Sequence, residues 1–187
     1  MLYSILAMIA VVVSANFLVQ IPVPGLEEYL TWGAVIFPFA FLVNDLTNRL
    51  LGPAKARRTV AVGAVAGVAL SAILADPRIA LASGAAFVAG QLLNIYIFNR
   101  LRDAAWWKSP VVSSTLGSVI DTYLFFFVAF YGVPFMMEKV SYAPIPLWAS
   151  LASWDLVVKL CVAAIAIVPY GIIVTKLLKG RKYDPSI

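Results

Sequence analysis

Six long apolar segments dominate this sequence of 187 residues. They lie near residues 2–20, 30–51, 59–75, 79–101, 110–132 and 154–178. A helix needs about 20 mainly apolar residues to cross a bilayer, and these segments are too long and continuous for the strands of a membrane barrel. We therefore predict an all-α integral membrane protein, a bundle of about six transmembrane helices that forms a single domain over residues 1–187.

Composition agrees with a protein whose solvent is lipid and argues against an enzyme. Hydrophobic residues make up 63% of the chain and charged residues 12%, whereas soluble domains average about 45–50% and 25%. The chain has no His, and its single Cys161 lies in an apolar segment, so metal chemistry, a disulfide framework and a base-activated nucleophile are all unexpected. We expect no cofactor. The absence of a Walker motif means that the chain would not hydrolyse ATP itself.

The basic residues gather in alternate connectors. Arg49, Lys55, Arg57 and Arg58 follow the second segment, further basic residues follow the fourth, and others occupy the C-terminal tail, whereas the remaining connectors hold few. Cytoplasmic loops of membrane proteins carry an excess of Lys and Arg. This pattern explains the net charge of +5 by topology rather than by nucleic-acid binding, and it predicts that both termini are cytoplasmic. The first segment lacks the basic start of a signal peptide, so we expect it to be retained.

Polar side chains recur at helical spacing inside four of the apolar segments. An ionised side chain at the bilayer centre costs about 2.5–3.5 kcal/mol, so such residues usually face a protein interior or a watery cavity. Asp121 is the strongest candidate because no basic residue neighbours it on its own helix. We expect the carboxylates and amides to converge on one polar cavity, with these candidate binding residues: Asp45, Asp121, Gln91, Asn94, Asn44 and Asn48.

Structural roles remain open for several of these residues. Amides between membrane helices can act as interhelical contacts worth about 0.6 kcal/mol, which applies to Gln91 and Asn94 and also to Asn16 and Gln20 of the first segment. Asp45 can pair with Arg49, which lies four residues later. Likewise, Asp155 and Lys159 can form a plain ion pair whose Lys extends outward to the interface.

The aromatic content near these polar residues suits a flat ligand. A carboxylate can accept two parallel N–H bonds from the edge of a purine-like base, amides can bond the adjacent atoms, and aromatic rings can stack on its faces. Trp32, Phe39 and Phe87 are candidates for stacking. From these residues alone we predict a polar cavity but not the identity of its ligand.

Two further features bear on packing. Gly63 and Gly67 form a pattern of small residues that favours close helix contact. The connector over residues 133–153 contains Pro134, Pro144 and Pro146, and it could hold a short interfacial helix or a lid.

Several longer motifs resemble those of a known family. They are Leu30-Thr-Trp-Gly33, Phe37-Pro-Phe-Ala-Phe-Leu42, Asn44-Asp-Leu-Thr-Asn-Arg-Leu-Leu-Gly-Pro53, Gln91-Leu-Leu-Asn94 and Asp121-Thr122. Together they look like the signature of the queuosine-precursor transporter (VUT) family, and the resemblance covers roughly residues 15–130. The family commonly has Asp where this chain has Asn94, which can bond a heterocycle but supplies no charge.

The resemblance implies a multi-pass protein of the bacterial inner membrane that takes up 7-deazaguanine bases, preQ0 (7-cyano-7-deazaguanine) or preQ1, for queuosine in tRNA. Under this hypothesis Asp121 and Asp45 accept N–H groups of the base, and the amide residues complete the contacts along its edge. The partners would be the small-molecule base and the lipid bilayer, with no nucleic acid, and a homodimer is compatible. The other interpretation is a substrate-binding module of an energy-coupling-factor vitamin transporter, which would need a partner subunit and ATPases.

Overall fold

The computed structural model describes residues 1–26, 30–141 and 143–180, with side chains described up to residue 176. The described chain is helical apart from its connectors and two isolated β-bridges. The elements are α1 (Leu2–Leu18), α2 (Trp32–Ile36), α3 (Phe39–Leu51), α4 (Pro53–Leu74), α5 (Pro77–Arg100), α6 (Lys108–Phe130), the 3-10 helix η1 (Phe135–Met137) and α7 (Leu147–Gly180). Because α2 and α3 together form one interrupted span, the predicted bundle of about six helices is confirmed.

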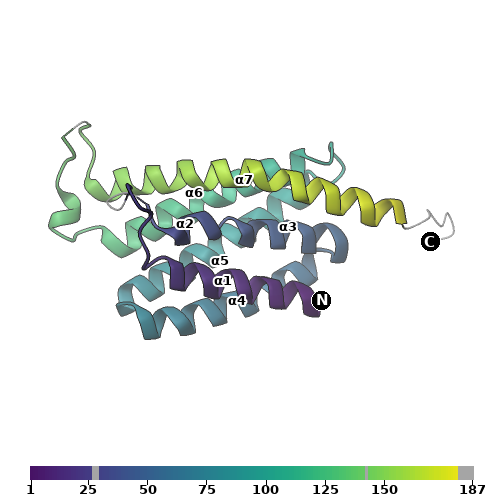
Figure 1. Ribbon diagram of the computed structural model, residues 1–187, viewed down its shortest axis with the longest axis horizontal. Helices are drawn as coiled ribbons and strands as arrows, with labels where there is room; N and C mark the ends of the chain where they lie inside the picture. The colour runs from purple at the N-terminus through teal and green to yellow at the C-terminus, as the bar shows by residue number, and fades with distance from the viewer. Residues whose placement is uncertain (27–29, 142, 181–187) are drawn as a thin grey trace.

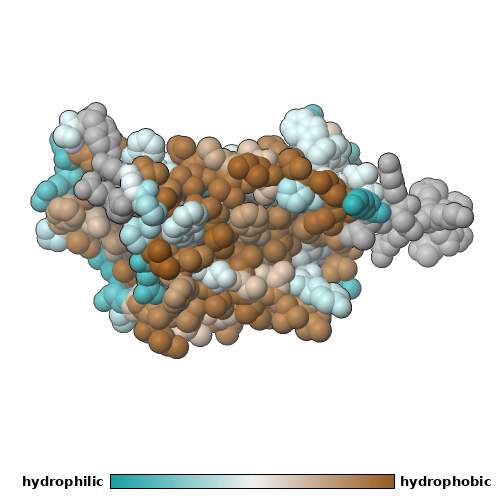
Figure 2. Space-filling view, viewed as in Figure 1, coloured by the Kyte–Doolittle hydropathy of each residue, from teal (hydrophilic) through white to brown (hydrophobic). Residues whose placement is uncertain are grey.

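The outer surface of the bundle is that of a membrane protein. On the face that Figure 2 shows, a broad hydrophobic belt covers the middle, and hydrophilic residues gather toward the two ends. Many large apolar side chains are exposed, and Val65, Ile73 and Ile165 are at least two-thirds exposed, as expected of residues that face lipid. Among the described helices, five are long and apolar enough to cross a membrane, and α1 is a shorter apolar helix of 17 residues.

Two helices begin well before the start that the sequence predicted. The fourth helical element, α4, starts at Pro53 instead of residue 59, because Gly52 adopts a positive φ of 87° that ends α3 and Pro is well suited to the first position of a helix. The three basic residues after Pro53 therefore lie on the first turns of α4 and not in a loop. Helix α7 starts at Leu147 instead of residue 154, directly after Pro146, so the long connector is confined to residues 131–146 and contains η1.

The second apolar segment is interrupted where the sequence predicted one helix. Residues Phe37 and Pro38 separate α2 from α3, and Pro38 supplies no amide hydrogen for a helical bond. Backbone carbonyls of both residues accept bonds from the first amides of α3. Interrupted helices within a membrane protein occur where the irregular backbone is buried in protein or lines a cavity.

Close helix contacts depend on glycines. An added Cβ at Gly63 would lie 2.7 Å from Met8 and one at Gly67 would lie 2.9 Å from Val12, so α1 packs against α4 at the small residues, as predicted. Where α5 and α6 cross, the close contacts are between the two backbones. A Cβ at Gly90 would lie 2.8 Å from the carbonyl oxygen of Gly117, and one at Gly117 would lie 2.9 Å from that of Gly90.

The N-terminus and the C-terminal end of α7 lie at the same end of the bundle, together with the turns that join α3 to α4 and α5 to α6 (Figure 1). The described connector residues 19–26, 30–31, 75–76, 131–141 and 143–146 lie at the other end. We call these the basic end and the connector end.

Candidate functional site

A cavity of about 430 Å³ lies in the half of the bundle nearer the connector end. Its volume is within the range of about 300–1,000 Å³ that is usual for small-molecule sites. The lining combines apolar and aromatic residues with a few polar ones, which are Asn16, Gln20, Thr31, Ser71, Ser83, Asp121, Asp155 and Lys159. We call this space the outer cavity.

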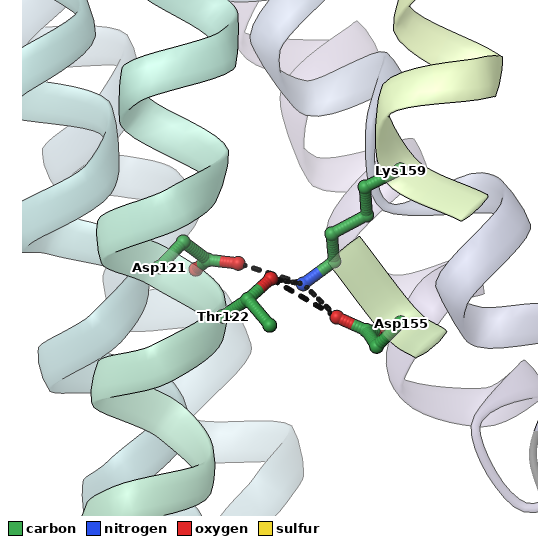
Figure 3. A network of polar contacts seen from close by, with 4 residues as sticks. All are labelled: Asp121, Thr122, Asp155 and Lys159. Carbon is green, nitrogen blue, oxygen red and sulfur yellow. Dashed lines mark hydrogen bonds and ion pairs between the residues drawn. The ribbon is translucent and has the colours of Figure 1, made fainter. Parts of the chain in front are cut away.

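One wall of the outer cavity holds a charged cluster from α6 and α7 (Figure 3). The Nζ atom of Lys159 lies 2.9 Å from Oδ2 of Asp121, 2.7 Å from Oδ2 of Asp155 and 2.9 Å from Oγ1 of Thr122. Thr122 in turn donates to Asp155 at 3.0 Å. Lys159 is 6% exposed, so its three N–H donors are all used inside the protein. Two carboxylates and one ammonium leave this charge cluster with a formal charge of −1.

Aromatic rings complete this part of the cavity. The Nζ atom of Lys159 lies 4.8 Å from the ring centroid of Phe37, a distance at which a cation is attracted to the face of the ring. The helix break at Phe37 and Pro38 places this ring beside α7. Phe125 and Phe126 line the same cavity and contact each other edge to face, with centroids 5.3 Å apart. The outer cavity therefore offers both charge and flat apolar surface.

A second polar cluster is buried among α3, α5 and α6. The Nδ2 atom of Asn44 donates to Oε1 of Gln91 at 2.7 Å and to Oδ1 of Asn94 at 3.0 Å. The Nδ2 atom of Asn94 donates to Oδ1 of Asp45 at 3.0 Å and to the hydroxyl oxygens of Ser113 and Ser114. Ser114 donates to Oδ2 of Asp45 at 2.8 Å. We call this set the amide network, and all of its side chains are buried.

The glycine crossing of α5 and α6 lies between the two clusters. Along α6, Ser113 and Ser114 precede Gly117, and Asp121 follows it by one turn. At the crossing, a Cβ on Gly90 would lie 2.8 Å from Cβ of Asp121, while one on Gly117 would lie 3.3 Å from Cβ of Asn94. The amide network thus lies on the side of the basic end and the charge cluster on the side of the connector end.

A smaller cavity of about 200 Å³ adjoins the amide network and is lined by Asp45, Ser114 and Tyr170, among others. Arg49 lies beyond it, where its Nε donates to the hydroxyl of Tyr170 at 3.2 Å and its Nη1 to the carbonyl of Arg102 at 3.0 Å. The suggested pair between Asp45 and Arg49 is not among the ion pairs of the described residues.

The structure divides the predicted binding residues into groups. It brings Asp45, Asn44, Gln91 and Asn94 together in the amide network and places Asp121 separately in the outer cavity. The buried side chain of Asn48 follows Asn44 by one turn and has no hydrogen-bond partner within the described part of the chain.

The three predicted stacking residues do not line the outer cavity. Trp32 is 41% exposed, Phe39 is half-buried, and buried Phe87 packs edge to face on Phe37 with centroids 6.0 Å apart. Phe37, the residue before Pro38, lines the outer cavity instead, where the stacking residues were expected.

Lys159 and Thr122 belong to the charge cluster but are not among the binding residues predicted from the sequence. The ion pair of Lys159 with Asp155 was foreseen, but the expected outward extension of Lys159 is wrong, because its side chain is 8% exposed and reaches α6. A signal was available: Lys159 is a basic residue within an apolar span, and Asp121 lacked a basic neighbour on its own helix. Isolated intramembrane charges of opposite sign are expected to pair.

Comparison with known proteins identifies the family. Residues 31–174 match the family described as "Putative vitamin uptake transporter". The chain belongs to this family. Over 200 residues it is 36% identical to the queuosine precursor transporter of Escherichia coli (strain K12), covering 94% of this chain and 86% of that protein.

Two further relatives are named "Probable queuosine precursor transporter". The one from Haemophilus influenzae is 34% identical over 207 residues, covering 91% of this chain and 85% of the relative. The one from Bacillus subtilis (strain 168) is 24% identical over 176 residues, covering 79% and 72%. No solved structure matches the chain. The protein is thus a multi-pass member of a bacterial transporter family and not an enzyme, and its substrate is a small molecule.

Proposed function

We propose that the chain takes up a 7-deazaguanine precursor of queuosine, preQ0 or preQ1, across the bacterial inner membrane. The observation that carries this proposal is the position of Asp121 in a cavity with aromatic walls, in a chain 36% identical to a queuosine precursor transporter. A carboxylate in such a cavity can recognise the N–H donors along the edge of a guanine-like base.

The geometry of Asp121 suits this role. Its Oδ2 atom is bound by Lys159, while its Oδ1 atom has no hydrogen-bond partner in the part of the chain that the structure describes. An edge N–H of the base would donate to Oδ1, and Phe37 or Phe125 would contact a flat face of the base. In this proposal the charged group that holds Asp121 in place is Lys159.

The distribution of basic residues supports an outer cavity that faces the cell exterior. The basic end carries the Lys and Arg residues that mark a cytoplasmic face, so both termini are assigned to the cytoplasm and the connector end to the outside. A base entering from outside would reach the charge cluster first and would find the amide network closed beneath it.

Unsatisfied atoms in the amide network support a role for it in passage. Oδ1 of Asn44, Nε2 of Gln91 and both side-chain polar atoms of Asn48 are buried without a partner in the described structure. Leaving a buried polar atom unpaired costs about 1–3 kcal/mol, which bonds to a passing ligand would offset. We therefore assign Asp45 and the amides to the second half of the path, where Asp45 already lines a small cavity.

Uptake by cells that cannot make the precursor tests the proposal. Such cells, when given external preQ0 and this chain, should restore queuosine in their tRNA. Asp121→Ala and Asp45→Ala should each abolish the restoration. Asp103→Ala is the matched control because Asp103 is exposed in the connector between α5 and α6. Normal queuosine with both buried substitutions would contradict the roles assigned here.

Reconstitution tests whether the chain works alone. The purified protein in liposomes should transport the base without ATP or a partner subunit. Transport that appears only with a partner and ATP would instead identify a binding module of an energy-coupling-factor transporter. An imposed pH gradient in the same liposomes distinguishes proton coupling from facilitated entry.

A further inference from the structure

The charge cluster is an ammonium-binding site that the protein fills with its own side chain. Three oxygen atoms from Asp121, Asp155 and Thr122 lie within 2.7–2.9 Å of Nζ of Lys159 and match its three N–H donors. The ring of Phe37 covers the same nitrogen at 4.8 Å. Two carboxylates, a hydroxyl and an aromatic face are the groups that would bind any primary ammonium ion.

This site belongs to the outer cavity. Lys159, both carboxylates and Phe37 all line that cavity, so a ligand there would meet the cluster directly. The side chain of Lys159 comes from α7, opposite the carboxylate of Asp121 on α6 (Figure 3). If this ammonium were removed, the site would keep its oxygen atoms and its ring, and its formal charge would change from −1 to −2.

The two proposed substrates differ in the group that such a site would recognise. The substituent of preQ0 is a neutral nitrile, whereas the aminomethyl group of preQ1 is a primary ammonium at neutral pH. We propose that Lys159 is a specificity-determining residue: it occupies the ammonium position of the outer cavity and so favours the neutral base over the cationic one. This inference rests on the proposed function.

Both the positive charge of Lys159 and its occupancy of the oxygen atoms favour the neutral base. A cationic substituent in the wild-type cavity would lie near the ammonium of Lys159 and would find the oxygen atoms already bonded. Placing like charges side by side costs free energy, so the ammonium of Lys159 disfavours a ligand that carries a positive charge at this position. A neutral base instead leaves the cluster intact and can still donate to the remaining oxygen of Asp121.

Substitution of Lys159 tests the inference. In binding measurements on the purified full-length protein, Lys159→Ala should shift the ratio of preQ1 affinity to preQ0 affinity toward preQ1 by about tenfold or more. Lys139→Ala is the matched control, since Lys139 is exposed at the connector end, and it should leave the ratio unchanged.

A double variant separates occupancy from net charge and covers a failure of Lys159→Ala to fold. Lys159→Ala combined with Asp155→Asn keeps the formal charge of −1 but vacates the ammonium position. It should also shift the ratio toward preQ1. If the double variant binds preQ0 and its ratio of preQ1 affinity to preQ0 affinity equals that of the wild type, occupancy by Lys159 does not set specificity and the inference fails.

A probe unrelated to queuosine tests the ammonium site by itself. Butylammonium chloride should raise the melting temperature of the two Lys159 variants in a concentration-dependent way, relative to equal sodium chloride, and should not do so for the wild type. The absence of this effect in both variants would overturn the inference. Wild-type protein that binds neither base would contradict the proposed function, whereas bound preQ0 with unaltered selectivity in the variants would contradict this inference alone.

Discussion

The ammonium of Lys159 lies 2.9 Å from the carboxylate of Asp121, although 38 positions separate the two residues. The contact joins α6 to α7 in the wall of the outer cavity, and both side chains are at most 8% exposed. Removing one partner of a buried ion pair leaves an uncompensated charge and typically costs about 3–5 kcal/mol. This pair therefore fixes the cavity wall and also positions the carboxylate that we assign to the ligand.

The first prediction separates these two roles of Asp121. Asp121→Asn keeps the shape of the side chain but removes a charged acceptor, while Lys159 retains Asp155 as its partner. Hydrogen bonds to charged groups contribute about 1.5–3 kcal/mol, so we expect affinity for preQ0 to fall by roughly 10- to 150-fold. Isothermal titration of the purified protein measures this loss. Asp103→Asn, at an exposed position, should bind as the wild type does, and an unchanged affinity of Asp121→Asn would remove Asp121 from the site.

The second prediction concerns the amide network. Asn94→Ala removes the donor to Asp45, Ser113 and Ser114 and the acceptor of Asn44 in a fully buried position. We expect the free energy of unfolding to fall by about 1–3 kcal/mol or more, because several buried groups lose their partner together.

Thermal unfolding in detergent measures this effect. Asn99→Ala on the same helix is the control, since the side chain of Asn99 is only partly buried and bonds residues three or four positions away. Equal melting temperatures for the two variants would show that the network contributes little to stability.

The sequence predicts the fold well because lipid imposes a simple rule. A spanning segment must be apolar and helical, so hydropathy locates the six spans without knowledge of their packing. The start of α4 was misplaced because Lys55, Arg57 and Arg58 reduce local hydropathy even though Pro53 begins a helix there. The break at Pro38 was not predicted as a break, because Pro within a membrane helix can kink it or interrupt it and neighbouring groups decide which.

The site was less predictable because it depends on which helices are neighbours. Spacing along one helix identified Asp121, Asp45 and the amides as interior residues, but it could not show that the glycine crossing at Gly90 and Gly117 separates Asp121 from the rest. Spacing along one helix also could not show where the side chain of Lys159 points. From the sequence alone, its ammonium can pair with Asp155 on the same helix and extend outward to the interface, or it can reach Asp121 on another helix.

The third prediction tests that glycine crossing. The obstacle to a Cβ at Gly90 is the backbone carbonyl of Gly117 at 2.8 Å, whereas at Gly63 it is the flexible side chain of Met8. Overpacking typically costs about 1–3 kcal/mol, and backbone yields less readily than a side chain. We expect Gly90→Ala to lower the melting temperature more than Gly63→Ala does. Because a Cβ at Gly90 would also lie 2.8 Å from Cβ of Asp121, only Gly90→Ala should weaken binding of preQ0. Comparable decreases in melting temperature for the two variants would mean that α5 and α6 can move apart at little cost in free energy.

The fourth prediction concerns the direction in which the outer cavity opens. Ser83 is half-buried on α5 and lines that cavity, and Ala104 is exposed in the connector at the basic end. Replacing Cys161, the single cysteine, by Ser allows a new cysteine to be introduced at each position in turn. A membrane-impermeant maleimide added to intact spheroplasts should label Ser83→Cys, and preQ0 should slow this reaction because the base would occupy the same space.

Ala104→Cys provides the comparison on the opposite face. Because Lys and Arg mark the cytoplasmic side, it should react only after the membrane is made permeable. If Ala104→Cys reacts in intact spheroplasts while Ser83→Cys does not, the bundle is inserted the other way round, and the charge cluster is then reached from the cytoplasm. An uptake route that begins at Asp121 would be incompatible with that orientation, since a base from outside would meet the closed amide network first.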